Sequence, residues 1–510
     1  THSGGTMVDA IAPPYYPIVY VRGYAGSQTG VENTVATPYM GFNEGSTKLR
    51  QVVTQDVQRH IFESPLIRLM KDHGYEDTYF SGSEVTGTAK PKSIWIYRYY
   101  EPVSKELGRG IRPEMEDYAK GLADFIDKIR DQTCGPKEST DPAVKQARSD
   151  FKVHLVAHSM GGLVVRSYLQ KIAVGRPDHP LVDKVFTYAT PHGGIDLRLV
   201  GNIPSFLKRN NAENFNEETM RRYLAIGKGK PVDDLNGTFP PDRFFCLVGT
   251  NSTDYGAAMG LSSFAVGPMS DGLVQIGNAT VKGSPRAFVH RSHSGHYGIV
   301  NSEEGYQNLR RFLFGNDRID VFLEIDDITL PRKVQKEKDG GKEIRASYHL
   351  EVTGGVRGAR WELHRRRVNE MSARYVDWER VKGAKDKPLH LMSSYLMGDA
   401  RVNTRRRSLG FSLEVGVLVP EYVVNKRIWL DDHYEGGYLL NEKVNFELSV
   451  VKDGPPRLKY GFDRRSPNAT RTFAPAVANE DGGWDFRVPI DSKTRPGLKG
   501  SLVISSRPWE

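Results

Sequence analysis

The stretch FKVHLVAHSMGGLVVRSYL, residues 151–169, decides the fold of the first half of the chain. An apolar run ends just before Ser159, two glycines follow, and a second apolar run begins with helical spacing. The pattern predicts a strand, a tight turn at the serine and a helix. A turn of this kind imposes strained backbone angles on the serine and projects its hydroxyl at the carboxyl edge of a sheet. Ser159 is therefore a candidate nucleophile.

The usual form of this motif has a glycine two residues before the serine and another two residues after it. In this chain Ala157 stands at the first position and Gly161 at the second. Both positions must be small, because the strand and helix backbones nearly touch there. Alanine adds only one methyl group, so we expect the turn to form. The alternative, an inert serine at a packing point, is disfavoured because nothing structural requires His-Ser-Met-Gly-Gly.

Length and composition indicate a folded chain of two or three domains. It has 510 residues, of which 38% are hydrophobic and 10% aromatic, and only two cysteines. Two cysteines do not make a disulfide framework. The formal net charge is +9, and residues 321–510 carry most of it, with 34 basic and 27 acidic side chains. This excess could favour anionic surfaces, but the mixed signs favour a solvated face.

Strand-like and helix-like segments alternate up to about residue 318. They include a strand at 16–23, a helix at 64–75, a strand at 93–102 and a helix at 112–133. This alternation predicts a mainly parallel sheet covered on both faces, the α/β class, in residues 1–318. Residues 319–510 instead show strand-like runs separated by turn residues. They predict a separate antiparallel β-sandwich.

The N-terminal sequence does not have the charged and apolar regions of a secretion signal. Met7 follows a short lead and could be the natural start, so we expect a cytoplasmic protein. Secretion after removal of an unseen signal is the alternative. No run of about 18 apolar residues is present, so we expect no transmembrane segment.

Five segments resemble α/β-hydrolase lipases and esterases of the bacterial-lipase type, one branch of which carries alanine at the position of Ala157. Besides the Ser159 stretch, they are PIVYVRGYAGS (17–27), ATPHGG (189–194), SDGLV (270–274) and GHYGIV (295–300). They resemble, in order, the oxyanion loop, a Thr-Pro-His turn, the acid loop and the histidine loop of that family. The resemblance covers about residues 15–315 and implies an α/β-hydrolase fold.

The resemblance implies a catalytic triad of Ser159, Asp271 and His296, in the chain order of α/β-hydrolases. It also implies an oxyanion hole made by the backbone N–H groups of Met160 and Tyr24.

Two of these roles have rival candidates. Asp254 also follows a predicted strand and is the rival acid, and His293 is the rival base. Three further histidines are expected to be structural, namely His158, His192 and His290.

Residues 195–240 form a long connection between two predicted strands. It contains apolar residues around Pro204, among them Phe206 and Leu207. We expect a cap or lid that walls the acyl pocket, with Phe206 and Leu207 binding substrate. A fixed cap and a moving lid are equally compatible with the sequence.

Neither a metal site nor a cofactor is expected, because no cluster shows zinc-ligand spacing. Arg-Arg-Arg occurs at 365–367 and at 405–407. Aromatic interleaving and a binding motif are missing, so we expect no nucleic-acid partner. Solvated sandwich edges are favoured, with contact to an anionic lipid surface as the alternative.

These observations predict a serine carboxylic-ester hydrolase, a lipase or esterase that acts on acyl esters or lipids through an acyl-enzyme intermediate. A phospholipase or a deacylase of glycolipid anchors is the competing enzyme hypothesis. A degenerate hydrolase that serves as a binding scaffold is the alternative without activity.

Overall fold

The computed structural model describes residues 10–23, 28–51, 57–80, 83–84, 87–99, 101, 105, 113–195, 215–254, 269–425, 432–451, 454–463 and 472–510. The chain divides into two compact units. The first consists of residues 1–286 and 291–313, and the second of residues 287–290 and 314–510. The predicted boundary at residue 318 lies within the strand β12 (Asp317–Thr329).

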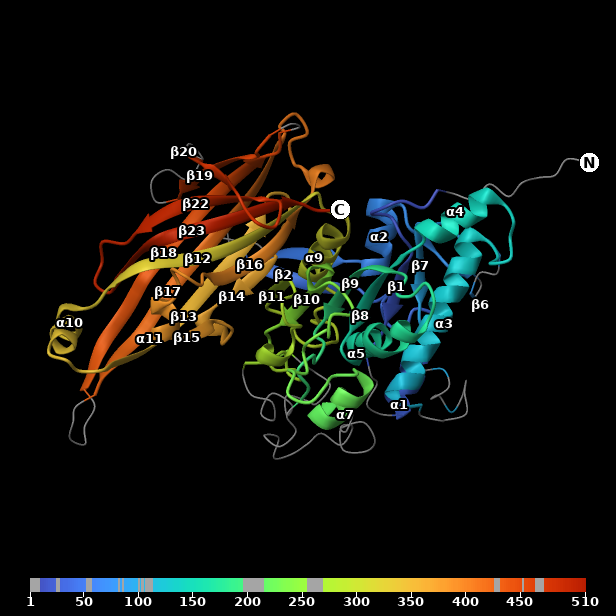
Figure 1. The fold of residues 1–510 in the computed structure, drawn as a ribbon, viewed down its shortest axis with the longest axis horizontal. Coiled ribbons are helices and arrows are strands. Elements are labelled where there is room, and N and C mark those ends of the chain that lie inside the picture. The colour runs from blue at the N-terminus through green and yellow to red at the C-terminus, as the bar shows by residue number, and fades with distance from the viewer. Residues whose placement is uncertain are drawn as a thin grey trace, which may run out of the picture. The chain divides into compact units, whose positions relative to one another are not determined.

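The first unit is built on six strands of a seven-stranded sheet (Figure 1), and the seventh, β11 (Arg286–Val289), is counted mostly with the second unit. The pairings of this sheet from β4 to β10 are parallel. The strand order is β11, β10 (Phe244–Gly249), β9 (Val182–Tyr188), β8 (Val153–His158), β1 (Ile18–Val21), β7 (Ser93–Ile96) and β4 (Glu76–Asp77). β1, β8, β9 and β10 are buried along their whole length, as expected for strands covered on both faces.

Helices surround this sheet, and two short hairpins accompany it. The helices are α1 (Gln28–Val35), α2 (Pro65–His73), α3 (Met115–Cys134), α4 (Pro142–Asp150), α5 (Met160–Ser167), α7 (Glu217–Tyr223) and α9 (Glu303–Phe314). The hairpins are β2 (Ser46–Gln51) with β3 (Val57–Phe62), and β5 (Tyr79–Phe80) with β6 (Ser83–Glu84). α2 begins and ends as the sequence predicts. Ser64 Oγ accepts a hydrogen bond from the Ile67 N–H, and Gly74 closes the helix at φ 69°.

The strand register shows that helices cover both faces of the sheet. Trp95 lies in the same row as Val19, and Phe186 lies in the adjacent row, so these two rings point to opposite faces. α3 places Phe125 against Trp95, with ring centroids 6.1 Å apart. α9 places Phe312 against Phe186, with centroids 6.0 Å apart. The sheet is therefore the middle layer of three, as the alternating sequence pattern predicts.

The second unit consists of two antiparallel sheets. One has the order β16 (Leu389–Leu396), β12, β23 (Gly497–Pro508), β22 (Trp484–Asp491) and β21 (Ala476–Ala478). The other has the order β14 (His364–Arg366), β13 (Ile344–Val356), β17 (Ser408–Val424), β18 (Asp432–Ser449), β19 (Arg457–Phe462) and β20 (Thr472–Ala474), and β15 (Arg374–Asp377) also pairs with β13. Two short helices, α10 (Arg332–Asp339) and α11 (Trp378–Lys382), complete the unit.

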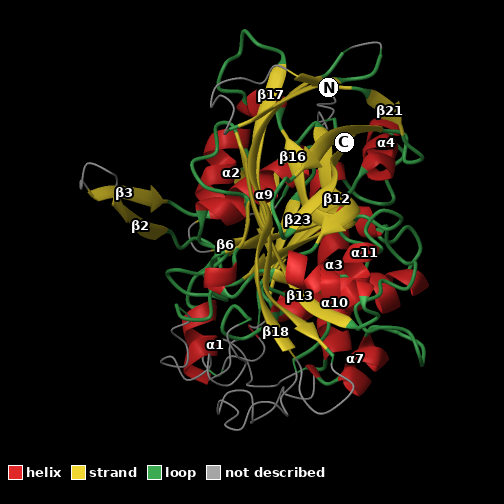
Figure 2. Ribbon diagram, turned by 90° about the vertical axis from the view of Figure 1, so that its left-hand side faces the viewer, coloured by secondary structure: helices red, strands yellow, loops and turns green. Residues whose placement is uncertain are grey.

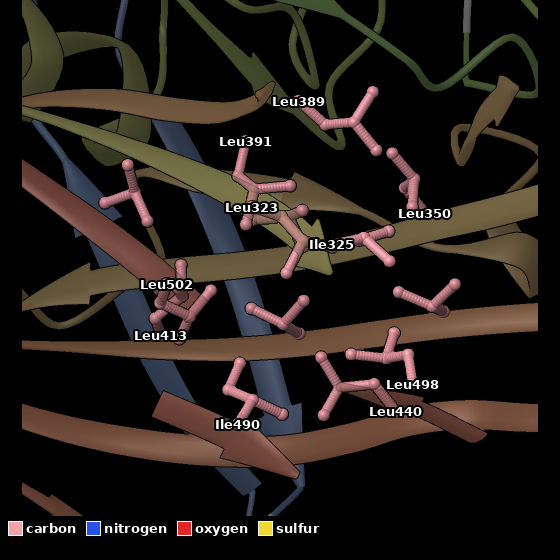
Figure 3. Close-up of a cluster of buried hydrophobic side chains, with 14 of the residues drawn as sticks. Leu323, Ile325, Leu350, Leu389, Leu391, Leu413, Leu440, Ile490, Leu498 and Leu502 are labelled. Atoms are coloured by element: carbon pink, nitrogen blue, oxygen red, sulfur yellow. The ribbon is translucent and has the colours of Figure 1, made fainter. Parts of the chain in front are cut away.

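A single apolar core fills the space between these two sheets. Alternate residues of β12 are buried, the pattern of a strand with one face in a core. Side chains from both sheets point into the same space in Figure 3, among them Leu323, Leu502 and Ile490 from one sheet and Leu350, Leu413 and Leu440 from the other. The expected fold class, an α/β-hydrolase fold followed by an antiparallel β-sandwich, is confirmed.

Candidate active site

Ser159 lies at the sharp turn between β8 and α5. Its backbone has φ 54° and ψ −128°, a positive-φ conformation that is uncommon for a residue with a side chain. The Ser159 N–H donates to the Tyr188 carbonyl at 2.9 Å, and the Thr190 hydroxyl donates to the Ser159 carbonyl at 2.8 Å. Such strain costs on the order of 1–3 kcal/mol and persists only where neighbouring contacts hold it. Both contacts come from the end of β9 and the turn that follows it.

Close packing at this turn explains which small residues it requires. A Cβ on Gly161 would lie 2.3 Å from the Val21 carbonyl oxygen and 2.7 Å from that of Arg22. A Cβ on Gly23 would lie 2.6 Å from the Ser159 Cβ. Ala157 is fully buried in β8 between its partners on β1 and β9, and its methyl group is accommodated. The turn thus requires glycine at position 161, whereas alanine is tolerated at position 157.

His293 connects Ser159 to Asp271. Its Nε2 lies 3.0 Å from the Ser159 Oγ, and its Nδ1 lies 2.8 Å from the Asp271 Oδ2. All three side chains are buried, with Ser159 7% exposed, His293 3% and Asp271 1%. An ionised carboxylate only accepts hydrogen bonds, so the Nδ1 carries the proton and the Nε2 is free to accept one from the serine. The result is a continuous hydrogen-bonded chain from a hydroxyl to a carboxylate.

Backbone groups hold the Asp271 carboxylate in place. Its Oδ1 accepts hydrogen bonds from the N–H groups of Leu273 and Val274, at 3.0 and 2.7 Å. Gly272, at φ 100°, provides the bend that brings these N–H groups back toward the side chain. The Asp271 carbonyl also accepts from the His293 N–H at 2.9 Å. Asp271 therefore fixes both the ring and the backbone of His293.

The structure brings His293 to Ser159, and not His296, the base chosen from the sequence. His296 is exposed, and its ring lies against that of Tyr297. The loop at 294–298 closes on itself, because the Gly298 N–H donates to the Gly295 carbonyl and the Ile299 N–H to the Ser292 carbonyl. His296 lies at the tip of this loop, whereas His293 lies just before it. Of these two histidines, His293 is the one that contacts Ser159.

The glycines on either side of His296 were a signal for this outcome. Gly295 has φ 90°, and a Cβ on Gly298 would lie 2.6 Å from the Ser294 carbonyl carbon. Two glycines that bracket a dipeptide are typical of a tight turn, whose middle residues point to solvent. The family resemblance favoured the histidine inside the turn, whereas the turn chemistry favoured the one before it.

His158 supports His293 from the end of β8. Its Nε2 lies 2.8 Å from the His293 carbonyl oxygen, and the two rings lie 5.0 Å apart. Burial, followed by the nearby His293 and Arg22, holds the pKa of His158 well below its usual value. The ring is therefore neutral and donates its Nε2 proton to that carbonyl. His158 is a positioning residue, in line with the structural role that the sequence predicts for it.

Asp254 and His192 bind groups other than Ser159 and His293. Asp254 is exposed, and its Oδ2 accepts from the Asn251 amide at 2.6 Å. His192 is buried with its Nε2 3.1 Å from the Thr187 hydroxyl, and burial holds its pKa well below the usual value. Asp271 and His293 are thus the acid and the imidazole that the fold brings to the serine.

The predicted oxyanion donors are only partly within the described residues. Met160 is the first residue of α5, where backbone N–H groups have no partner within the helix. This N–H lies directly after the serine, at the positive end of the helix dipole. Tyr24 lies outside the described residues.

The described part of the predicted cap is docked on α5. Three polar side chains in or just after α5 donate hydrogen bonds to backbone carbonyls of the cap. Arg166 donates to the carbonyls of Val232 and Asp234. Ser167 donates to the carbonyl of Tyr223, and Gln170 donates to that of Leu224. Arg166 is fully buried, and desolvation lowers its pKa to about 10, so it remains charged at neutral pH. Residues 215–240 are thus fixed to the first unit. Phe206 and Leu207 lie outside the described residues.

The described residues contain no group of three or more histidine, cysteine, aspartate or glutamate side chains arranged to hold a metal ion. Over the same part of the chain, we find no helix with the length and apolarity that a bilayer crossing requires.

Comparison with known protein families relates part of the chain to a family model. A family model described as the PGAP1-like alpha/beta domain matches residues 112–226. This range runs from α3 to α7 and contains the Ser159 turn. Fold and family model together confirm the expected resemblance to α/β-hydrolase lipases and esterases. The first unit therefore has an α/β-hydrolase fold.

Comparison with solved structures finds proteins that have low sequence identity and a low TM-score against this chain. Mature lipase BlEst2 of Bacillus licheniformis has 16% identity and a TM-score of 0.32, with 60% of this chain and 94% of that chain covered. Phospholipase PlaB from Legionella pneumophila has 12% identity and a TM-score of 0.33, with 82% and 89% covered. The comparison with curated proteins found no match.

The packing at the turn makes a first prediction. Gly161→Ala should lower the free energy of unfolding by about 3 kcal/mol, because its methyl group would press on two backbone carbonyls. Ala157→Gly should cost no more than about 1 kcal/mol. Gly175→Ala is the matched control, since no atom lies within 4 Å of its Cβ position. Urea unfolding would measure all three, and equal losses for Gly161→Ala and Gly175→Ala would contradict the packing.

The buried histidines make a second prediction. Desolvation lowers the pKa of His73 and of His154 to about 4, and those of His158 and His192 lie well below the usual value. The unfolded chain has values of about 6.5, so it binds more protons than the folded chain below that pH. Stability should therefore fall as the pH drops from about 6.5 toward 4, by up to about 1.4 kcal/mol per pH unit for each histidine.

Chemical unfolding at a series of pH values measures this slope. In His154→Gln the slope should be shallower than in the unaltered chain. A free energy of unfolding that stays constant over this range would show that these rings are not neutral in the fold.

Proposed function

We propose that the chain is a serine hydrolase of carboxylic esters that works through an acyl-enzyme intermediate. Ser159 is the nucleophile, His293 the general base and Asp271 the acid that orients it. The observation that carries this proposal is the hydrogen-bonded chain from the Ser159 Oγ through His293 to Asp271. A buried serine in a strained turn that merely filled space would have no reason to contact an oriented imidazole.

Acylation follows from the positions of the protons. The His293 Nε2 takes the proton of the Ser159 hydroxyl as the Oγ attacks the ester carbonyl carbon, and a tetrahedral intermediate forms. The imidazolium then gives this proton to the leaving alcohol oxygen as the carbon–oxygen bond breaks. Asp271 stabilises the imidazolium through the Nδ1 proton without taking it. Water repeats the sequence on the acyl-enzyme and releases the carboxylic acid, so no cofactor is needed.

The developing oxyanion requires backbone donors. The Met160 N–H is the first donor in our proposal, and the N–H of Tyr24 is the second. A lost donor of this type lowers kcat by about 10²–10³-fold. The position of Met160 at the start of α5 adds the helix dipole to this hydrogen bond.

For the substrate, we propose a lipid or another ester with an apolar acyl chain, with Phe206 and Leu207 on the wall of the acyl pocket. The resemblance to α/β-hydrolase lipases supports this choice. A phospholipase or a glycolipid-anchor deacylase would use the same serine and base and differ only in the alcohol released. Release of fatty acid from triacylglycerol, phosphatidylcholine and a glycosylated lipid anchor separates these activities.

Substitution of the two histidines tests the proposed base. Ser159→Ala and His293→Ala should each lower kcat for a p-nitrophenyl ester by about 10³-fold or more. His296→Ala is the matched control and should stay within about twofold of the unaltered chain, since His296 lies on an exposed turn. Thermal unfolding would confirm that all three variants fold. A large loss in His296→Ala with normal turnover in His293→Ala would overturn the assignment.

A further inference from the structure

The hairpin of β2 and β3 carries an exposed apolar face. Figure 2 shows the hairpin extending away from the helices and strands of its own unit. The register pairs Thr47 with Ile61 and Leu49 with Arg59, so these four residues lie on one face, and Val57 follows on the same face of β3. Leu49, Val57 and Ile61 are 63%, 64% and 69% exposed. Three large apolar side chains therefore share one exposed surface, which we call the hairpin face.

An exposed surface of this kind is unusual for such a short element. A two-stranded hairpin is only marginally stable in water unless something packs against it. Single exposed apolar residues are common, but several on one face mark a contact site. The hairpin face thus indicates a partner that covers it.

The charge of the hairpin identifies the kind of partner. Its two strands, STKLRQ and VQRHIF, contain no acidic residue, and Arg59 is the cationic residue on the hairpin face, whereas Lys48 lies on the opposite face and pairs with Glu304. Arg59 is exposed and lies directly opposite Leu49 on the hairpin face. Apolar side chains next to cationic ones are typical of elements that lie in the interface of an anionic membrane.

The base of the hairpin is fixed to the segment that presents the histidine. Ser46 Oγ donates to the Asn301 carbonyl at 2.6 Å, and the Phe62 ring lies 6.2 Å from that of Tyr306. Lys48 contacts Glu304 at 3.3 Å, and the same carboxylate pairs with Arg291 at 3.0 Å. Arg291 stands two residues before His293. The hairpin is therefore anchored at one end, while its outer residues remain exposed.

We propose that the hairpin face is a lipid-surface contact that holds the enzyme on anionic membranes. Leu49, Val57 and Ile61 enter the boundary between headgroups and acyl chains. Arg59 extends its guanidinium to the lipid phosphates, as amphipathic side chains do at membranes.

A second copy of this chain is the competing occupant. Pairing of two hairpin faces would bring the Arg59 guanidinium groups of both copies together, and the hairpin face carries no acidic residue to neutralise them. Charge thus favours an anionic lipid surface. This contact is independent of ester hydrolysis, so it can be tested in a chain without activity.

Flotation with vesicles of equimolar phosphatidylcholine and phosphatidylglycerol tests the proposal. The measurement uses the full chain with Ser159→Ala, so that no lipid is consumed. The triple variant L49T/V57T/I61T should have a partition coefficient onto these vesicles at least about tenfold lower than that of the parent. The substitutions remove the apolar contact but keep strand-forming residues. V174T/V402T/V477T is the matched control, since these valines are 71%, 67% and 53% exposed. This control should bind like the parent.

An environment-sensitive dye locates the contact. Both native cysteines are buried, so Ile61→Cys offers a selective label, and Val477→Cys offers the control. Dye emission at residue 61 should shift to the blue with anionic vesicles, and emission at residue 477 should not. Arg59→Glu should weaken binding, and added salt should weaken binding of the parent.

Three results would overturn the proposal. They are equal binding by the two triple variants, no shift at residue 61, and a concentration-dependent dimer that L49T/V57T/I61T abolishes. Turnover of a soluble acetate ester by L49T/V57T/I61T with Ser159 restored separates the two proposals. Normal turnover with lost vesicle binding supports both proposals, whereas vesicle binding by the chain that keeps Ser159, without any turnover, retains the contact and refutes the hydrolase.

Discussion

Where β8 passes into α5, the backbone of Gly161 lies so close to β1 that a methyl group would meet the Val21 and Arg22 carbonyls at 2.3 and 2.7 Å. This close approach forces the chain to turn at Ser159 with a positive φ. It also directs the start of α5, and with it the Met160 N–H, to the carboxyl edge of the sheet. The position of the serine hydroxyl thus depends on main-chain packing between a strand and a helix that lie far apart in sequence.

Around this turn, buried hydrogen bonds hold the groups on which the chemistry depends. His158 is held neutral by desolvation and supports the His293 carbonyl. The Asp271 carboxylate is 1% exposed, and two backbone N–H groups and the His293 ring satisfy it. A buried charge with hydrogen-bond partners is stable, whereas one without them is costly. Ser159, Asp271 and His293 therefore come from three different loops and form one buried polar network.

The sequence predicted the parts of this arrangement that have local signals. Such signals come from residues that are neighbours in the sequence. They are the apolar run before Ser159, the Asp-Gly turn at Asp271 and the change of pattern near residue 318. His293 was ranked second to His296 as the candidate base, because the choice depends on how the loop at 294–298 folds back and on which of its ends faces the serine. Arg166 was missed because a charged residue inside an apolar helix gives no sign of the carbonyls it binds. The exposed apolar face of the β2–β3 hairpin likewise becomes visible only with the strand register.

Reaction with a fluorophosphonate, followed by mass spectrometry of the digested chain, tests the central claim most directly. Such a probe phosphonylates a serine only where a base activates the hydroxyl and donors stabilise the phosphoryl oxygen. The account predicts one adduct, on the peptide that contains Ser159, and a strongly reduced rate of labelling in His293→Ala but not in His296→Ala. An adduct on another serine, or labelling of Ser159 at an unchanged rate in His293→Ala, would contradict it.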